Sequence, residues 1–447
     1  MLAYPSPHCN LNTNSIKTKM AHLFLFTLLA LSSSLPSIFA AHTAGLHLRL
    51  THVDSGQPFS STGRIHRLVQ RSLHRRKVLE SRLANNPSAS FNVPVKASMF
   101  DYFIEYSIGT PKLPVTGVLD TGSEVVWAKC RPCSEQCDEK GIGIYDPSKS
   151  STFSKLPCSS PLYDYQPLKS VSVPKCEYVY VYGSAMINGF LATETFSLGA
   201  ESPTVNLTFG CNRLVKGTFS GASGVVGLGQ GKLSLVSQLN LGRFSYCLTP
   251  FKSSSKSHLL LGDFASAKKA SSGEVQSTPF LNATDQYYVA MRGISIGGNL
   301  LPIPASVFEY SKEESTGVLV DSGTGQTQLP QSAFDVIKKE LQSLVGLRVK
   351  DMSKTVGLDL CFGLLSWPPP PLPDMVFHFD NGADLRMPQM NYMFADKRTR
   401  AYCLVMRPGQ NGDKLTIIGN YQQQNMHIIY DVASRMLLFE SIPCESF

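Results

Sequence analysis

The stretch VLDTGS at residues 118–123 decides the fold, because a close copy, LVDSGT, recurs at residues 319–324. Each copy is followed downstream by two β-branched residues and a glycine, at 225–227 (VVG) and at 417–419 (IIG). Two copies of one device in a single chain predict two similar lobes that face each other.

Each copy is suited to presenting one carboxylate. An apolar strand buries one side, and the glycine two residues after the aspartate lets the backbone turn sharply and donate N–H groups to the carboxylate oxygens. The hydroxyl of Thr121 or Ser322 can tie its own loop to the opposite loop. Two such loops that meet on a pseudo-two-fold axis place Asp120 and Asp321 within hydrogen-bonding distance of each other.

At that distance both aspartates cannot ionise at low cost, so the pair holds one proton over a wide acidic range and titrates as a unit. The ionised partner takes a proton from a bound water, and the protonated partner polarises the carbonyl of a substrate. Water is the nucleophile, so this chemistry needs no metal and no cofactor. A single Asp-Thr-Gly is more often an ordinary turn; the second copy with matched flanks favours catalysis.

Positive charge is concentrated near the N-terminus. The chain of 447 residues has a net charge of +8, and residues 41–95 hold eight of its Lys and Arg residues against Asp54 and Glu80. The body beyond them carries no net charge. This distribution argues against a nucleic-acid-binding surface on the body.

Ten of the eleven cysteines lie beyond the N-terminal region, and an even number in an exported chain predicts about five disulfides. Zinc is the alternative, suggested by the C-x-x-C pair at 130–133 with Cys137 close by. No histidine or second C-x-x-C stands at ligand spacing, so we favour disulfides. The ten are Cys130, Cys133, Cys137, Cys158, Cys176, Cys211, Cys247, Cys361, Cys403 and Cys444.

The N-terminal region predicts two processed segments. Residues 1–40 end in an apolar stretch that follows Lys17 and Lys19, which is typical of a signal peptide, with Met20 as a second candidate start. An N-terminal anchor is the alternative, but the apolar run is short for a membrane span. Residues 41–92 resemble a basic, helical pro-segment whose cations lie against an acidic cleft; the alternative is a solvated basic helix. We expect a secreted protein without stable membrane insertion, either extracellular or vacuolar.

From residue 93 onward the pattern is mostly β, with short alternating or aromatic runs that end at turn residues. Residues 332–346 form the one convincing helical pattern. We expect an N-terminal lobe over 93–272 and a C-terminal lobe over 273–447.

The body resembles the pepsin-like aspartic proteases, and in detail their plant nepenthesin-type branch. The resemblance rests on ordered matches along residues 97–447, and it implies a bilobal fold with the active site in the cleft between two pseudo-symmetric β lobes. The segments that carry it are 120–127 (DTGSEVVW), 209–211 (FGC), 227–238 (GLGQGKLSLVSQ), 244–248 (FSYCL), 293–298 (GISIGG), 358–362 (LDLCF) and 417–426 (IIGNYQQQNM).

The resemblance assigns roles by position. It makes Asp120 and Asp321 the catalytic pair of an acid-active endopeptidase, supported by the rest of both motifs: Thr121, Gly122, Ser123, Ser322, Gly323 and Thr324. Ser123 and Thr324 match hydroxyls that hydrogen-bond the outer carboxylate oxygens. Tyr182, before Gly183, matches a flap tyrosine, and Trp127 matches the indole that positions it. An ordinary strand aromatic and an ordinary core residue are the alternatives for these two.

The resemblance also implies disulfide pairs. They are Cys130–Cys133, Cys137–Cys211, Cys158–Cys176, Cys247–Cys444 and Cys361–Cys403. Asn206 and Asn282 begin glycosylation sequons, which a secreted chain can use.

Two departures from the branch concern the site. The flap at 182–189 is shorter than usual and carries Met186 and Ile187, and Gly325-Gln326 replaces a threonine and an apolar residue after the second motif. We expect these two departures to affect the rate and the substrate specificity of cleavage more than its mechanism.

Two functions are therefore weighed. The first is an endopeptidase that takes protein and peptide substrates, binds pepstatin-type inhibitors and acts as a monomer. The rival is a catalytically weak or inactive binding protein on the same fold, similar to the plant xylanase inhibitors. The retained aspartates, glycines and flap tyrosine favour the protease.

Overall fold

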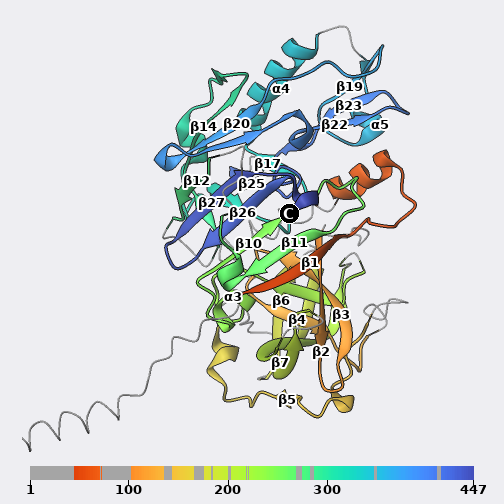
Figure 1. Ribbon diagram of the computed structural model, residues 1–447, viewed down its shortest axis with the longest axis vertical. Coiled ribbons are helices and arrows are strands. Elements are labelled where there is room, and N and C mark those ends of the chain that lie inside the picture. Colours follow the sequence, from red (N-terminus) through yellow and green to blue (C-terminus); the bar gives the residue numbers. More distant parts are fainter. Residues whose placement is uncertain are drawn as a thin grey trace, which may run out of the picture. The chain divides into compact units, whose positions relative to one another are not determined.

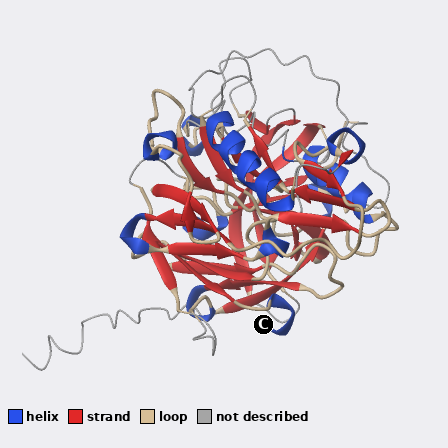
Figure 2. Ribbon diagram, turned by 90° about the horizontal axis from the view of Figure 1, so that it is seen from above, coloured by secondary structure: helices blue, strands red, loops and turns tan. Residues whose placement is uncertain are grey.

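A computed structural model provides the structure. It describes residues 45–70, 72, 102–134, 143–165, 176–182, 185–199, 203–217, 219, 221–267, 274–281, 286–346, 350–409 and 414–447. Strands make up most of the regular secondary structure of the described chain, and helices are few and short (Figure 2). Among the described helices none is long and apolar enough to cross a membrane. The predicted signal peptide at 1–40 lies outside the described residues.

One large sheet of fourteen strands dominates the structure, in the order β12-β27-β26-β10-β11-β1-β2-β3-β9-β4-β8-β7-β5, with β6 paired to β7. Strands from both halves of the sequence meet in it, because β10 pairs with β26. Its members are β1 (Leu46–His52), β2 (Tyr102–Ile108), β3 (Leu113–Asp120), β4 (Val126–Lys129), β5 (Ser154–Lys155), β6 (Tyr178–Tyr182), β7 (Ala185–Ser197), β8 (Thr204–Lys216), β9 (Gly224–Gly227), β10 (Arg243–Cys247), β11 (Ser257–Leu261), β12 (Gln276–Pro279), β26 (Met426–Asp431) and β27 (Met436–Ser441).

Three smaller sheets come from the second half of the chain. The five-stranded sheet contains β13 (Tyr288–Val289), β16 (Gly317–Val320), β25 (Leu415–Ile418), β17 (Thr327–Leu329) and β24 (Met406–Pro408). A four-stranded sheet contains β15 (Asn299–Leu300), β14 (Met291–Ile296), β20 (Met375–Phe379) and β21 (Asp384–Met387). The other contains β18 (Lys350–Asp351), β19 (Cys361–Gly363), β23 (Ala401–Leu404) and β22 (Met393–Asp396).

The described helices connect and cover these sheets. The predicted helix at 332–346 is α4 (Gln331–Val345), which buries Ala333, Phe334, Ile337 and Leu341 along one face. The others are α3 (Leu235–Gln238), α5 (Ser353–Val356) and the 3₁₀ turns η1 (Pro147–Lys149), η2 (Pro161–Asp164), η3 (Gly262–Phe264), η4 (Ala305–Phe308), η5 (Asp380–Gly382), η6 (Gln389–Asn391) and η7 (Cys444–Ser446).

Both copies of the duplicated motif take the same local structure, and the prediction of a mostly β fold is confirmed. β3 pairs in parallel with β9, so that Asp120 lies opposite Gly227. β16 pairs in parallel with β25, so that Val320 lies opposite Ile418. Buried central strands read as continuous apolar runs rather than as an alternation, as Gly317–Val320 does.

The described part of the segment over residues 41–92, namely residues 45–70 and 72, is built into the fold. β1 lies between β11 and β2, antiparallel to both (Figure 1). Residues 61–70 then form a helix that buries Ile65, Leu68 and Val69 in an apolar cluster with Phe251 and Tyr421 of the body.

The arginines of this helix differ from expectation. Arg67 donates to Asp54 of the same segment at 2.8 Å, and Arg64 donates to the backbone carbonyl of Phe251 at 3.0 Å. The prediction that these cations oppose carboxylates of an acidic cleft is therefore wrong for both residues. The reason is that the apolar face of the helix docks on the body and directs these side chains to nearer acceptors. The later arginines of the segment lie outside the described residues.

Three implied disulfides are formed, namely Cys158–Cys176, Cys247–Cys444 and Cys361–Cys403. The pairs Cys130–Cys133 and Cys137–Cys211 are wrong, because Cys130 is bonded to Cys211, with their Cα atoms 5.4 Å apart. The reason is strand pairing: β4 runs parallel to β8, which sets Ala128 beside Cys211 and brings Cys130, just after the end of β4, close to it. Cys133 is also disulfide-bonded, and Cys137 lies outside the described residues.

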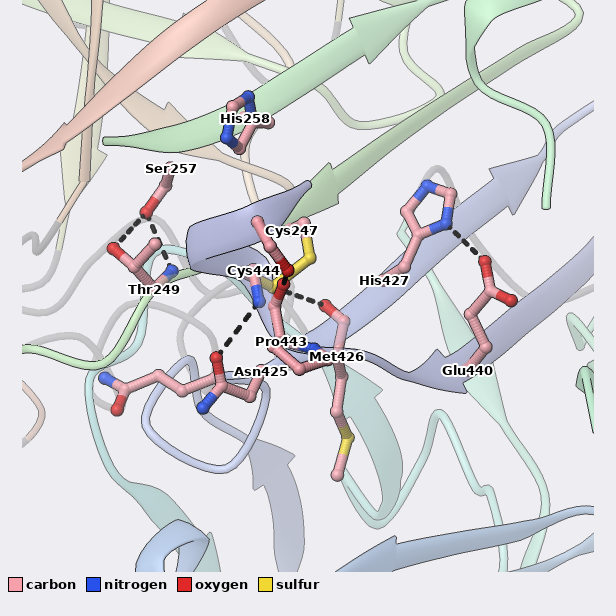
Figure 3. The surroundings of a disulfide bond; sticks show 12 residues. Cys247, Thr249, Ser257, His258, Asn425, Met426, His427, Glu440, Pro443 and Cys444 are labelled. Carbon is pink, nitrogen blue, oxygen red and sulfur yellow. Dashed lines mark hydrogen bonds and ion pairs between the residues drawn. A yellow bond between two sulfur atoms is a disulfide. The ribbon is translucent and has the colours of Figure 1, made fainter. Parts of the chain in front are cut away.

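The Cys247–Cys444 bond fastens the C-terminus to the large sheet. Figure 3 shows Cys444 reaching β10, while its backbone N–H donates to the side chain of Asn425 at 3.2 Å. Close by, His427 hydrogen-bonds the carboxylate of Glu440 at 2.8 Å across β26 and β27. The last residues of the chain are thereby held to strands of both halves.

We predict that the Cys130–Cys211 bond contributes substantially to stability. It closes a loop of 81 residues, so the double substitution Cys130→Ala/Cys211→Ala should lower the free energy of unfolding by about 4 kcal/mol. Cys158→Ala/Cys176→Ala, which opens a loop of 18 residues, is the matched control and should cost less. Peptide mapping without reduction should recover Cys130 joined to Cys211; recovery of Cys130 joined to Cys133 contradicts the structure.

A buried carboxylate stabilises the N-terminal half. Glu194, in β7, is fully buried and accepts hydrogen bonds from the hydroxyls of Tyr145 and Thr152 and from the backbone N–H of Thr195. Burial by itself raises the pKa of Glu194, but the hydrogen bonds from these groups outweigh it and hold the pKa below its ordinary value.

This carboxylate predicts a pH dependence. Because the pKa is lower in the folded chain, ionised Glu194 stabilises the fold above about pH 4.3, and this contribution is lost as the pH falls through the folded pKa. Glu194→Gln should therefore lower the free energy of unfolding by about 1–3 kcal/mol at pH 7, with a smaller loss near pH 3. The exposed Glu314→Gln is the control, and an unchanged loss across this range would refute the interpretation.

Candidate active site

The two copies of the motif form matching loops. Asp120 ends β3 and accepts a hydrogen bond from the backbone N–H of Gly122 at 3.0 Å. Asp321 follows β16 and accepts one from the N–H of Gly323 at 2.9 Å. Each glycine thus donates to the carboxylate two residues before it, as the motif predicts.

The loops are joined by reciprocal hydrogen bonds. Thr121 Oγ1 accepts from the backbone N–H of Ser322 at 2.9 Å, and Ser322 Oγ accepts from the N–H of Thr121 at 3.1 Å. Each hydroxyl then donates to a carbonyl beyond the opposite loop: Thr121 to Val320 at 3.4 Å and Ser322 to Leu119 at 3.1 Å. All four bonds are buried, so they fix the two loops against each other.

The two carboxylates meet at Gly323. A Cβ atom added to this glycine would lie 2.5 Å from Asp120 Oδ1 and 3.2 Å from Asp321 Oδ1. No side chain fits there, which explains why the second motif needs glycine at this position. Asp120 and Asp321 are both fully buried in this structure. The structure therefore brings together the two aspartates that the sequence pairs.

The loops differ in their outer hydroxyls. Thr324 donates to Asp321 Oδ2 at 2.6 Å, as the resemblance implies. The Ser123 hydroxyl has no hydrogen-bond partner among the described residues, so its expected bond to Asp120 is not formed here. The surroundings of the loops differ: Asn420 fastens the second loop by donating to the carbonyl of Ser322 at 2.9 Å, whereas Leu228, in the corresponding place after β9, has no side-chain donor.

Two buried tyrosines and a glutamine lie near the aspartate loops, and the sequence did not identify them as residues of the site. The hydroxyls of Tyr246 and Tyr430 are 2.9 Å apart, and Tyr246 also donates to the side chain of Gln423. Burial, then the neighbouring Tyr430 and the charge of Asp321, raise the pKa of Tyr246 well above its usual value, so it stays a neutral donor. The segment 417–426 carried the signal for Gln423 and Asn420, because it is unusually rich in amides.

The predicted flap is a β-hairpin of β6 and β7, in which Tyr182 pairs with Ala185. The side chain of Tyr182 and the whole of Gly183 lie outside the described residues, so their roles stay predictions. Trp127 lies in β4, fully buried, with its ring edge-to-face with Phe219 at 4.8 Å. Its predicted bond to the flap tyrosine likewise stays a prediction.

The glycosylation of Asn206 and Asn282 also stays a prediction. Asn206 is an exposed residue of β8, where an attached sugar meets no steric obstacle from burial. Asn282 lies outside the described residues. Among the described residues, no three His, Cys, Asp or Glu side chains are grouped so as to hold a metal ion.

Fold and paired-aspartate loops together define a protein of the pepsin-like class. Sequence comparison agrees: the family described as "Xylanase inhibitor N-terminal" matches residues 102–263, and "Xylanase inhibitor C-terminal" matches residues 286–441. The chain is 38% identical to aspartic proteinase nepenthesin-1 of Nepenthes gracilis, over 90% of this chain and 91% of that protein. It is 34% identical to nepenthesin-2 of the same plant, over 90% of both chains.

Solved structures support the fold. The crystal structure of basic 7S globulin from soybean superposes with a TM-score of 0.58 at 20% identity, covering 76% of this chain and 92% of that one. The chain belongs to the pepsin-like aspartic protease family.

We predict that the reciprocal bonds between the loops hold the site together. Thr121→Val leaves the N–H of Ser322 buried without its acceptor and should lower the free energy of unfolding by about 1–3 kcal/mol. Ser322→Ala should lower the free energy of unfolding by a similar amount, since Ser322 makes the reciprocal pair of hydrogen bonds. Thr121→Ser keeps the hydroxyl and should retain most of the stability. Urea unfolding measures all three, and equal stability of Thr121→Val and the unchanged chain would count against the bonds.

Proposed function

We propose that the chain is the precursor of a secreted, acid-active aspartic endopeptidase, in which Asp120 and Asp321 activate water against peptide bonds. The single observation that carries the proposal is the meeting of both carboxylates at Gly323. The family relationship supports it, because the chain spans nine tenths of two relatives named as aspartic proteinases.

The chemistry follows from the proximity of the two carboxylates. One aspartate is ionised and the other protonated in the working acidic range, because two adjacent charges repel. The ionised carboxylate removes a proton from water as that water attacks the peptide carbonyl, and the protonated one donates to the carbonyl oxygen. The N–H groups of Gly122 and Gly323 stabilise the negative charge that the pair carries. The pair titrates together, so neither aspartate has a permanent role.

The N-terminal segment supports a precursor form. Its helix packs on the body through Ile65, Leu68 and Val69, and its Ser72 contacts the chain just beyond the second aspartate loop: Ser72 Oγ accepts from the backbone N–H of Gln326 at 2.7 Å. In this proposal residues 41–92 are a pro-segment that must leave before substrate enters, and the lobes are 93–272 and 273–447. The four disulfides between described cysteines agree with export of the chain, because disulfides persist in oxidising compartments.

The rival function is a binding protein without catalysis. One observation favours it, since the matching families are named for xylanase inhibitors. The reciprocal bonds of Thr121 and Ser322, and the glycine N–H donors to both aspartates, favour the protease, because they maintain a geometry that binding alone does not require.

We predict acid-dependent cleavage by the full chain. After incubation at acidic pH, it should digest an unfolded protein substrate, and pepstatin should block the digestion. Asp120→Asn removes one of the two carboxyl groups that share a proton. It should therefore lower the rate of peptide cleavage by about 10⁴-fold. Product release measured by mass spectrometry gives both the rate and the cleavage sites.

The exposed Asp263→Asn is the matched control and should keep full activity. Absence of pepstatin-sensitive cleavage, with Asp120→Asn behaving like the unchanged chain, would overturn the protease in favour of the binding protein. N-terminal sequencing of the acid-treated chain reports whether residues 41–92 are removed.

A further inference from the structure

A cluster of buried glutamines surrounds the second aspartate loop, and one differs from the rest. Gln422 donates to the carbonyls of Asn391 and Val405, both at 3.0 Å, and accepts from the N–H of Thr327 at 2.9 Å. Gln423, Gln424 and Gln328 also have hydrogen-bond partners for their amides.

Gln326 is fully buried, yet neither its Nε2 nor its Oε1 has a hydrogen-bond partner among the described residues. Buried amides are nearly always paired, because water no longer satisfies them. An unpaired buried amide is therefore unusual, and the partner of this one is not among the described residues.

The position of Gln326 points to the partner. It stands two residues after Thr324, which donates to Asp321. Its backbone packs against Gly419, where an added Cβ would lie 2.6 Å from the Gln326 carbonyl carbon. The glutamine is thus held rigidly a short step along the chain from the paired carboxylates.

The N-terminal segment covers this place. Ser72 Oγ accepts from the N–H of Gln326 at 2.7 Å, and the Ser72 carbonyl accepts from Gln328 Nε2 at 2.6 Å. Ser72 Oγ also donates to the carbonyl of Leu68 at 3.0 Å, so the serine belongs to the segment and not to the body. When the segment leaves, the backbone N–H of Gln326 and Nε2 of Gln328 both lose their acceptors on Ser72.

We propose that Gln326 is a specificity-determining residue, whose amide binds a planar carboxamide or protonated carboxyl side chain of the peptide substrate. This inference rests on the proposed function. A carboxamide offers one donor edge and one acceptor edge, which match Oε1 and Nε2 of Gln326 in a two-bond pair. A carboxylic acid has the same pattern once it is protonated, so Asp and Glu are accepted only at acidic pH.

The test compares cleavage profiles. The acid-treated full chain is given internally quenched peptides in which each position around the scissile bond carries in turn Gln, Glu or norleucine. At one position Gln should raise kcat/KM by about tenfold over norleucine, and Glu should match Gln only below about pH 4. Gln326→Met, which is close in volume, should abolish this preference for Gln over norleucine. Gln331→Met, on the exposed start of α4, is the matched control and should keep it.

A second measurement does not need activity. In the full chain, Gln326→Met should leave the Tm unchanged or raise it, because an unpaired buried amide is replaced by an apolar group. A lowered Tm shows that the amide is bonded within the fold and overturns the inference.

The outcomes separate the two proposals. Pepstatin-sensitive cleavage with the same profile in Gln326→Met overturns the role of Gln326 and leaves the protease standing. No pepstatin-sensitive cleavage by the unchanged chain overturns the protease. In that case fluorescence anisotropy of the same labelled peptides, with the acid-treated chain, decides: preferential binding of Gln peptides that Gln326→Met loses supports the subsite, and equal binding of Gln and norleucine peptides overturns it.

Discussion

Everything at the site depends on the exchange of hydrogen bonds between Thr121 and Ser322. Each hydroxyl accepts from the opposite backbone N–H and donates to a carbonyl beyond it, so neither loop can shift without losing four buried bonds. Two carboxylates at close range repel each other, and a site that holds them together needs a rigid frame. The frame is made of neutral hydrogen bonds, which do not weaken as acid protonates the surroundings. The geometry is therefore independent of the charge it has to carry.

The duplicated motif explains how much of the fold was predictable. Asp120, Asp321 and the hydroxyls beside them follow from local sequence, because the pattern of strand, aspartate and glycine forms the same turn in both copies. The parallel partners at 225–227 and 417–419 follow from the repeat. The prediction of the helix at 332–346 needed only its periodicity, since α4 buries one face. In each of these cases the sequence signal lies within a few neighbouring residues or occurs in both copies of the motif.

Other features depend on distant pairings that no local pattern contains. The Cys130–Cys211 bond joins residues 81 apart and arises because β4 runs beside β8, whereas the resemblance implied Cys130–Cys133. Ser123 and Thr324 stand at the same place in the two motifs, yet only Thr324 hydrogen-bonds its aspartate. Gln326 was visible as an unusual residue, but its unpaired amide emerged only when the partners of its neighbours were known. The acceptors of Arg64 and Arg67 were unpredictable for the same reason. The sequence shows that both side chains are charged, but their hydrogen-bond acceptors depend on how the helix packs on the body.

The place of β1 has one more consequence. This strand fills the position between β11 and β2, and the helix after it covers part of the body. If the chain is cut beyond residue 72, the severed piece is still attached by its backbone ladder and its apolar face. Scission and departure are then separate events. The first is irreversible, whereas the second is an ordinary dissociation that dilution favours and crowding opposes, so a nicked molecule can be occupied by its own former N-terminus or by that of a neighbour.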